Sequence, residues 1–128
     1  MLQRRRGAVS RRNLLVSLLV LGVVGIAGWY VLGHSSPTPW NKPADVDGAT
    51  VRLTYSGSAC QDSADVEVGE SDTRVVITVV QTVRARSCDE AAVPYDVVVR
   101  LSDPLAGRML VDGACEIEEY ARYVACAG

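Results

Sequence analysis

Two different hydrophobic patterns divide this chain of 128 residues. The first is an uninterrupted run of 19 uncharged residues, from Leu14 to Leu32. A helix of that length is about 28 Å long, close to the ~30 Å hydrocarbon core of a bilayer. The run predicts one N-terminal transmembrane helix over residues 14–33.

The second pattern is the alternation of apolar and polar residues in short segments after residue 50. Val51, Leu53 and Tyr55 alternate with polar neighbours, and residues 73–83 are rich in β-branched side chains. Such side chains fit a pleated, half-buried strand better than a helix. Because the segments are short and separated by turn residues, they predict an all-β fold, a small antiparallel β-sandwich over residues 51–128.

Two segments do not follow either pattern. Residues 34–50 carry Pro37, Pro39 and Pro43 and show no periodicity, so we expect a Pro-rich linker between the membrane and the domain. Residues 115–126 fit either a helix or the return strand of a hairpin that follows Asp112-Gly113. We favour the hairpin for this tail.

The charge distribution gives the membrane segment an orientation. Five of the 13 basic residues lie within residues 1–13, which contain no acid, so this segment is expected to be cytoplasmic. The other eight stand against 15 acids, a net charge of −7 for residues 34–128. An acidic domain of this kind is a poor partner for nucleic acid.

The export segment has three interpretations. An uncleaved, single-pass signal anchor suits its length, and we favour it. A cleaved secretory signal usually has a shorter apolar core that ends at an Ala-x-Ala-like site, and no Ala-x-Ala occurs here. Ser10-Arg11-Arg12-Asn13-Leu14-Leu15 resembles a twin-arginine signal, although paired arginines also precede ordinary anchors.

The chain has four cysteines, all in the part expected to be exported: Cys60, Cys88, Cys115 and Cys126. An even number of cysteines in a small extracytoplasmic domain predicts two disulfides with three possible connectivities. We favour Cys60–Cys88 and Cys115–Cys126. A zinc site made of all four is the alternative, but the paired cysteines two to four residues apart that such sites use are missing.

Residues suited to catalysis are scarce in the predicted domain. His34 is the only histidine and Lys42 the only lysine, and both lie in the predicted linker. This excludes Ser-His-Asp and Cys-His catalysis within residues 51–128 and leaves a carboxylate pair as the only acid–base chemistry. We therefore expect no catalytic site, no cofactor and no metal, with a carboxylate-dependent hydrolase as the alternative.

The most distinctive surface cluster lies in the tail and combines three acids with two aromatic residues. It consists of Glu116, Glu118, Glu119, Tyr120 and Tyr123. Tyrosine supplies contact area at a low entropic cost and is common at binding hot spots. If the protein works by binding, this cluster is our candidate contact with a partner.

The domain resembles a group of small, uncharacterised exported β-domain proteins of high-GC Gram-positive bacteria. The residues that carry the resemblance are 75–83, Cys88-Asp89, 97–101 and the corner 103–113, which contains Pro104-Leu105-Ala106-Gly107-Arg108 and Val111-Asp112-Gly113. The resemblance implies an export segment before the domain and brings no assigned activity or site residue. This chain departs from it after Gly113, where the tail with Cys115 and Cys126 is extra.

These observations predict an accessory or binding domain outside the cell, anchored in the bacterial cell membrane through residues 14–33. The expected partner is another envelope protein or a cell-wall component. A cleaved, secreted form of the same domain is the alternative, and the sequence leaves the oligomeric state open.

Overall fold

The computed structural model describes residues 15–24, 33–84, 87–89 and 91–127. The chain forms two compact units, Met1–Leu32 and Gly33–Gly128. In the first unit, residues 15–24 are helical. Across the described ranges, no helix is both long enough and apolar enough to span a membrane. Residue 14 and residues 25–32 of the predicted transmembrane helix, and the basic segment before it, lie outside the described residues.

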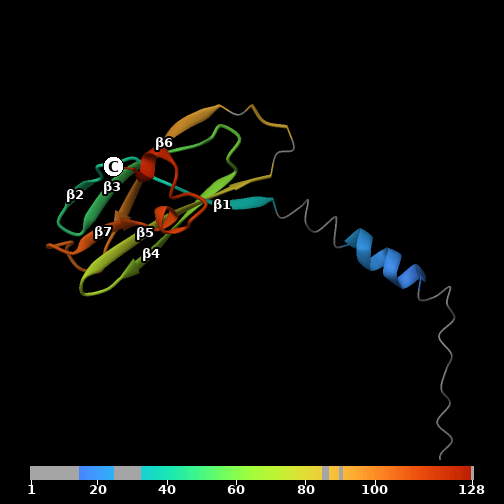
Figure 1. Cartoon of the computed structure of the whole chain (residues 1–128), viewed down its shortest axis with the longest axis horizontal. Coiled ribbons are helices and arrows are strands. Elements are labelled where there is room, and N and C mark those ends of the chain that lie inside the picture. Colours follow the sequence, from blue (N-terminus) through green and yellow to red (C-terminus); the bar gives the residue numbers. More distant parts are fainter. Residues whose placement is uncertain (1–14, 25–32, 85–86, 90, 128) are drawn as a thin grey trace, which may run out of the picture. The chain divides into compact units, whose positions relative to one another are not determined.

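The second unit is an all-β domain with antiparallel sheets, as the alternation of apolar residues predicts (Figure 1). Two short 3₁₀ helices follow the last strand. In chain order the elements are β1 (His34–Thr38), β2 (Asp45–Asp47), β3 (Thr50–Ser58), β4 (Ser63–Glu70), β5 (Arg74–Val83), β6 (Ala92–Arg100), β7 (Met109–Asp112), η1 (Gly113–Glu116) and η2 (Val124–Cys126).

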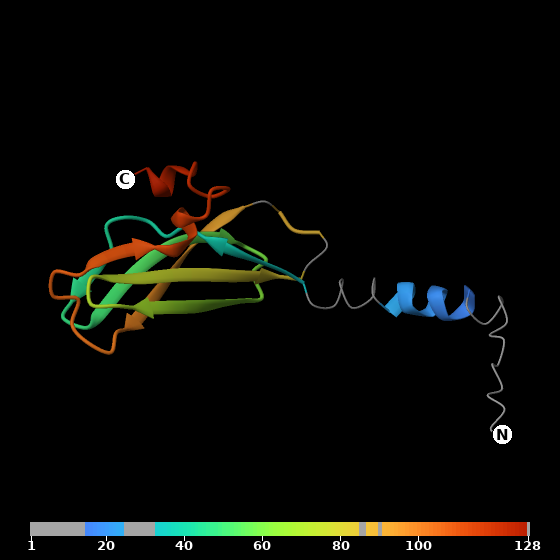
Figure 2. The same ribbon diagram turned by 60° about the horizontal axis from the view of Figure 1, so that its bottom comes forward.

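Two sheets stack face to face (Figure 2). One has the order β2-β3-β6, and the other is built around β5, with β4 along one edge. The opposite edge of β5 is shared by two strands. β1 pairs antiparallel with Val79–Val83, and β7 pairs parallel with Arg74–Ile77. The parallel β5–β7 pair departs from the predicted antiparallel pattern, because the corner after β6 carries the chain to the other sheet and starts β7 beside Arg74.

The core lies between the sheets and is built from the alternating residues of β3 and β5. Val51 and Tyr55 of β3 and Val75, Ile77 and Val79 of β5 are at most 1% exposed. Burial of one such side chain stabilises the fold by roughly 1.5–3 kcal/mol. The alternation of apolar and polar residues that predicts these strands therefore also identifies most of the core.

The prediction of a linker over residues 34–50 is wrong. This segment contains β1 and β2, and Trp40 between them is 3% exposed and packs in the core. Pro37 is compatible with β1 because this strand pairs with β5 along one side only, and an edge strand tolerates a residue that lacks an N–H, whereas Pro39 and Pro43 lie outside the strands. The described domain therefore begins at Gly33, well before the predicted boundary at residue 51.

The tail is neither a helix nor a hairpin, so our preference for a hairpin is wrong. Asp112, the last residue of β7, accepts a hydrogen bond from Ala114 N at its Oδ1 atom, at 3.0 Å. This contact caps η1 and turns the chain away from the sheet. The rest of the tail consists of turns and η2.

Both favoured disulfides are present. The Cα–Cα distances are 5.9 Å for Cys60–Cys88 and 5.4 Å for Cys115–Cys126, within the normal range for a disulfide. The first connects the loop after β3 to the segment after β5, and the second closes the tail into a loop. Since every cysteine is paired, the four-cysteine zinc alternative is wrong.

Candidate functional site

The disulfide-closed tail forms one wall of a groove of about 470 Å³ on the side of the sandwich. The chain around the end of β1 also lines the groove, and single residues of β3 and β5 complete the lining. This volume falls within the range of about 300–1,000 Å³ that is typical of small-ligand sites. The lining residues are Ser36, Pro37, Thr38, Pro39, Asn41, Ser56, Gln81, Glu119, Tyr120, Tyr123 and Ala125.

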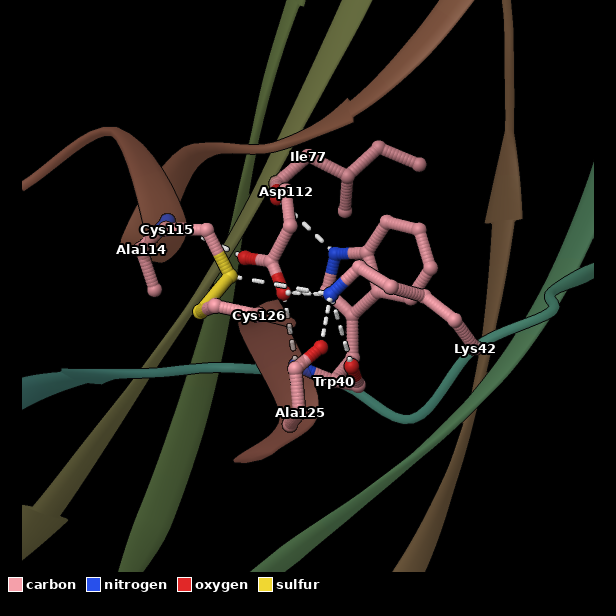
Figure 3. Close-up of polar contacts among 8 residues, drawn as sticks. All are labelled: Trp40, Lys42, Ile77, Asp112, Ala114, Cys115, Ala125 and Cys126. Carbon is pink, nitrogen blue, oxygen red and sulfur yellow. Dashed lines mark hydrogen bonds and ion pairs between the residues drawn. A yellow bond between two sulfur atoms is a disulfide. The ribbon is translucent and has the colours of Figure 1, made fainter. Parts of the chain in front are cut away.

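The tail loop is held on the sheets by Lys42, whose ammonium group forms several contacts at the junction of β1 and β7 (Figure 3). Lys42 Nζ lies 3.0 Å from Asp112 Oδ2 and donates a hydrogen bond to Ala125 O at 2.6 Å. It also contacts Trp40 O at 3.2 Å and Cys115 Sγ at 3.6 Å. One side chain thus connects the strand region to both ends of the tail loop.

Asp112 is the buried partner of this ion pair, with a side chain that is 2% exposed. Its Oδ2 atom also accepts a hydrogen bond from Trp40 N at 2.9 Å, and its Oδ1 atom accepts the bond from Ala114 N. A buried carboxylate is stable only when its oxygens are paired in this way. Asp112 therefore fixes the end of β1, the start of η1 and the position of Lys42 together.

Around this ion pair lie three residues that could in principle bind a metal ion: Asp112, Cys115 and Cys126. Their potential ligand atoms, a carboxylate oxygen and two sulfurs, all lie within 4.8 Å of one another. Both sulfur atoms belong to the disulfide, so they offer no thiolate to a metal. The oxygens of Asp112 are already occupied by hydrogen bonds and the ion pair. The chemistry of this trio fits a structural contact and does not fit a metal centre.

The structure divides the predicted contact cluster in the tail. Glu119, Tyr120 and Tyr123 line the groove together. Glu116 instead forms an ion pair with Arg74 of β5, at 2.5 Å between Oε1 and Nη2. Glu118 is exposed and is not part of the groove wall.

The two tyrosines of the groove lie side by side. Their ring centroids are 5.7 Å apart, and the ring planes are tilted by 36°. Burial raises the pKa of the Tyr120 phenol, and the neighbouring charge of Glu119 raises it further. The phenol therefore stays protonated at neutral pH.

Thr38, at the end of β1, carries a buried polar atom that the sequence does not reveal. Thr38 is 6% exposed, and its buried Oγ1 atom has no hydrogen-bond partner among the described groups. A buried hydroxyl left without a partner costs roughly 1–3 kcal/mol. Such groups are uncommon in folded proteins, and this one is enclosed by the fold and is not open to the groove.

Sequence reasoning identified the tail side of the groove but missed the side formed by residues 36–41. The prolines of that segment predict a linker, and the sequence shows Lys42 only as an isolated base. Trp40 was the one available signal, since a large aromatic residue among prolines is more often buried than solvated.

Comparisons of the chain with protein-family models, with curated proteins and with solved structures find no match. The resemblance to exported β-domain proteins of high-GC Gram-positive bacteria therefore stays a prediction.

Proposed function

We propose that this protein is a single-pass membrane protein of the bacterial cell envelope, whose domain outside the membrane binds a partner through the groove beside the tail loop. Residues 14–33 would form the signal anchor, with residues 1–13 in the cytoplasm. The partner would be another envelope protein or a component of the cell wall. In this role the protein is an accessory or binding module and not an enzyme.

The observation that carries this proposal is the construction of the groove. One disulfide closes the tail loop, and Lys42 fixes both ends of that loop to the sandwich. The loop thereby presents Tyr120 and Tyr123 to a concave surface that also carries polar groups. Rigid aromatic side chains beside a few polar groups are typical of binding sites.

Location outside the membrane is supported by the cysteines and by the N-terminal sequence. Disulfides persist in oxidising compartments and are rare in the cytosol. Five arginines before a long uncharged run are the usual arrangement of an anchor with its N-terminus inside.

Site-specific photo-crosslinking in intact cells tests the binding role. A photoreactive residue replaces Tyr123 in the groove, and in a matched control it replaces Val98, which is 59% exposed on β6 and does not line the groove. We expect a discrete adduct from position 123 and none from position 98. Equal adduct patterns at both positions would contradict binding through the groove.

A further inference from the structure

We propose that the groove recognises a ligand through a positively charged ammonium group, held between the Glu119 carboxylate and the rings of Tyr120 and Tyr123. This inference rests on the proposed binding function and specifies the chemistry of the ligand. The ammonium group would belong to a short peptide or to an amino sugar, both of which carry primary amines.

The charge of the groove favours a cation. Among the described residues that line the groove, Glu119 is the only charged one, and the other side chains are neutral. Lys42 contacts Ala125 at the border of the groove, but its charge is paired with that of Asp112. Arg122, the one basic residue of the tail, is not part of the lining. The site therefore combines a local charge of −1 with a domain of net charge −7, and an anionic ligand would be repelled.

The aromatic pair adds a second attraction for a cation. The face of a tyrosine ring is negative, and a cation within about 6 Å of the ring centroid is attracted to it. With centroids 5.7 Å apart, Tyr120 and Tyr123 are close enough for one ammonium group to contact both. A carboxylate beside two aromatic rings forms part of an aromatic cage of the kind that binds ammonium ligands.

Neutral polar groups complete the site. An ammonium group has three N–H donors, and the carboxylate does not use all of them. Ser36, Asn41 and Gln81 of the lining carry oxygen acceptors. The volume of about 470 Å³ suits one sugar unit or a few amino-acid atoms around the ammonium group.

Titrations of the full-length chain in detergent with defined amines test this inference. The probes are trilysine and a glucosamine trimer, each compared with its fully N-acetylated form, and binding is followed by NMR of the tyrosine rings. We expect at least one amine to shift the rings of Tyr120 and Tyr123, and its acetylated form to bind at least tenfold more weakly. Which amine binds distinguishes a peptide source from a sugar source. Equal binding of the amine and its acetylated form, or no binding of either amine, would overturn the inference.

Two matched pairs of variants locate the interaction. Glu119→Gln should weaken binding of the amine at least fivefold, whereas Glu118→Gln, one residue away and outside the groove, should leave it unchanged. Tyr123→Leu should lose most of the affinity, because it removes the ring face, and Tyr123→Phe should lose less than Tyr123→Leu, because it retains that face. Equal effects of the two glutamate variants would overturn the inference. Adducts at position 123 together with failed amine titrations would leave the groove as the binding site and refute only the ligand class.

Discussion

Lys42 and Asp112 are separated by 70 residues, and their side chains meet at 3.0 Å where β1 and β7 adjoin along β5. The side chain of Lys42 is 26% exposed, and that of Asp112 is 2% exposed. The pair is the point at which the strand region, the core residue Trp40 and the tail loop are joined. The shape of the groove depends on it, because the pair sets the position of one groove wall.

Substitution of Asp112, the buried partner of this ion pair, should strongly destabilise the domain. Asp112→Ala should lower the free energy of unfolding by about 3–5 kcal/mol, because it leaves the Lys42 charge and two backbone N–H groups without their acceptor. Denaturant unfolding measures this change. The matched control is the exposed pair Arg52–Asp45, at 3.5 Å, where Asp45→Ala should cost at most about 1 kcal/mol. Similar losses for the two variants would contradict the structural role of Asp112.

The tail disulfide should hold the groove wall in place. The double variant Cys115→Ser/Cys126→Ser should lose roughly 3 kcal/mol of stability and become sensitive to proteolysis within residues 115–127. Cys60→Ser/Cys88→Ser, which removes the other disulfide, should lose about 3–4 kcal/mol but keep the tail protected. Limited proteolysis with mass mapping separates the two cases, and a protected tail in the first variant would contradict this assignment.

Gly113 allows η1 to pack closely on β5. A Cβ atom at this position would overlap Thr78 Oγ1 and lie 3.1 Å from Val76 Cγ1. Gly113→Ala should therefore destabilise the domain by about 1–3 kcal/mol through overpacking. Gly69→Ala is the matched control, because the nearest atom to its Cβ would be 3.9 Å away in ordinary contact. Thermal unfolding measures the stability of both variants. Equal stability of the two would contradict the close packing of η1 on β5.

The stability of the domain depends on pH through the Glu70 carboxyl group. The Ser102 N–H donates a hydrogen bond to Glu70 Oε1 at 2.7 Å and lowers the pKa of this carboxyl below its ordinary value of 4.5, and Arg108 lowers it further. A lowered folded-state pKa means that the carboxylate stabilises the fold above pH 4.5 and that this contribution is lost as the pH falls through the folded-state value.

Glu70→Gln should therefore reduce stability at neutral pH and flatten its decline in acid. Unfolding free energies measured between pH 7 and pH 3 give both slopes. Glu67→Gln, on the exposed side of β4, is the control and should keep the wild-type slope. A steeper decline in the Glu70 variant would contradict the sign of this effect.

Much of the sandwich could be predicted from local sequence. The alternation of Val51, Leu53 and Tyr55 identifies β3 and its buried face, because a strand exposes every second residue to the same side. Cys115 and Cys126 could be paired by their short separation of 11 residues. In both cases neighbouring residues carry the information.

The missed features depend on contacts between distant residues. The burial of Trp40 and the edge strand β1 require β5, about 40 residues later, and the proline content of the segment points the other way. The groove brings residues 36–41 against Glu119, Tyr120 and Tyr123, and no local pattern reports that contact. No local pattern predicts that Glu116 lies apart from the rest of the tail cluster, because it forms an ion pair with the distant Arg74 of β5.

Cysteine labelling in spheroplasts is the most direct test of the claim that this is a membrane-anchored, disulfide-closed domain outside the cell. A membrane-impermeant thiol reagent should label no cysteine at first and should label Cys60, Cys88, Cys115 and Cys126 after an impermeant reductant is added. The labelled, full-length protein should stay with the membrane fraction after a high-salt wash. Labelling without reductant, labelling only after lysis, or release of a shorter soluble form would contradict the account.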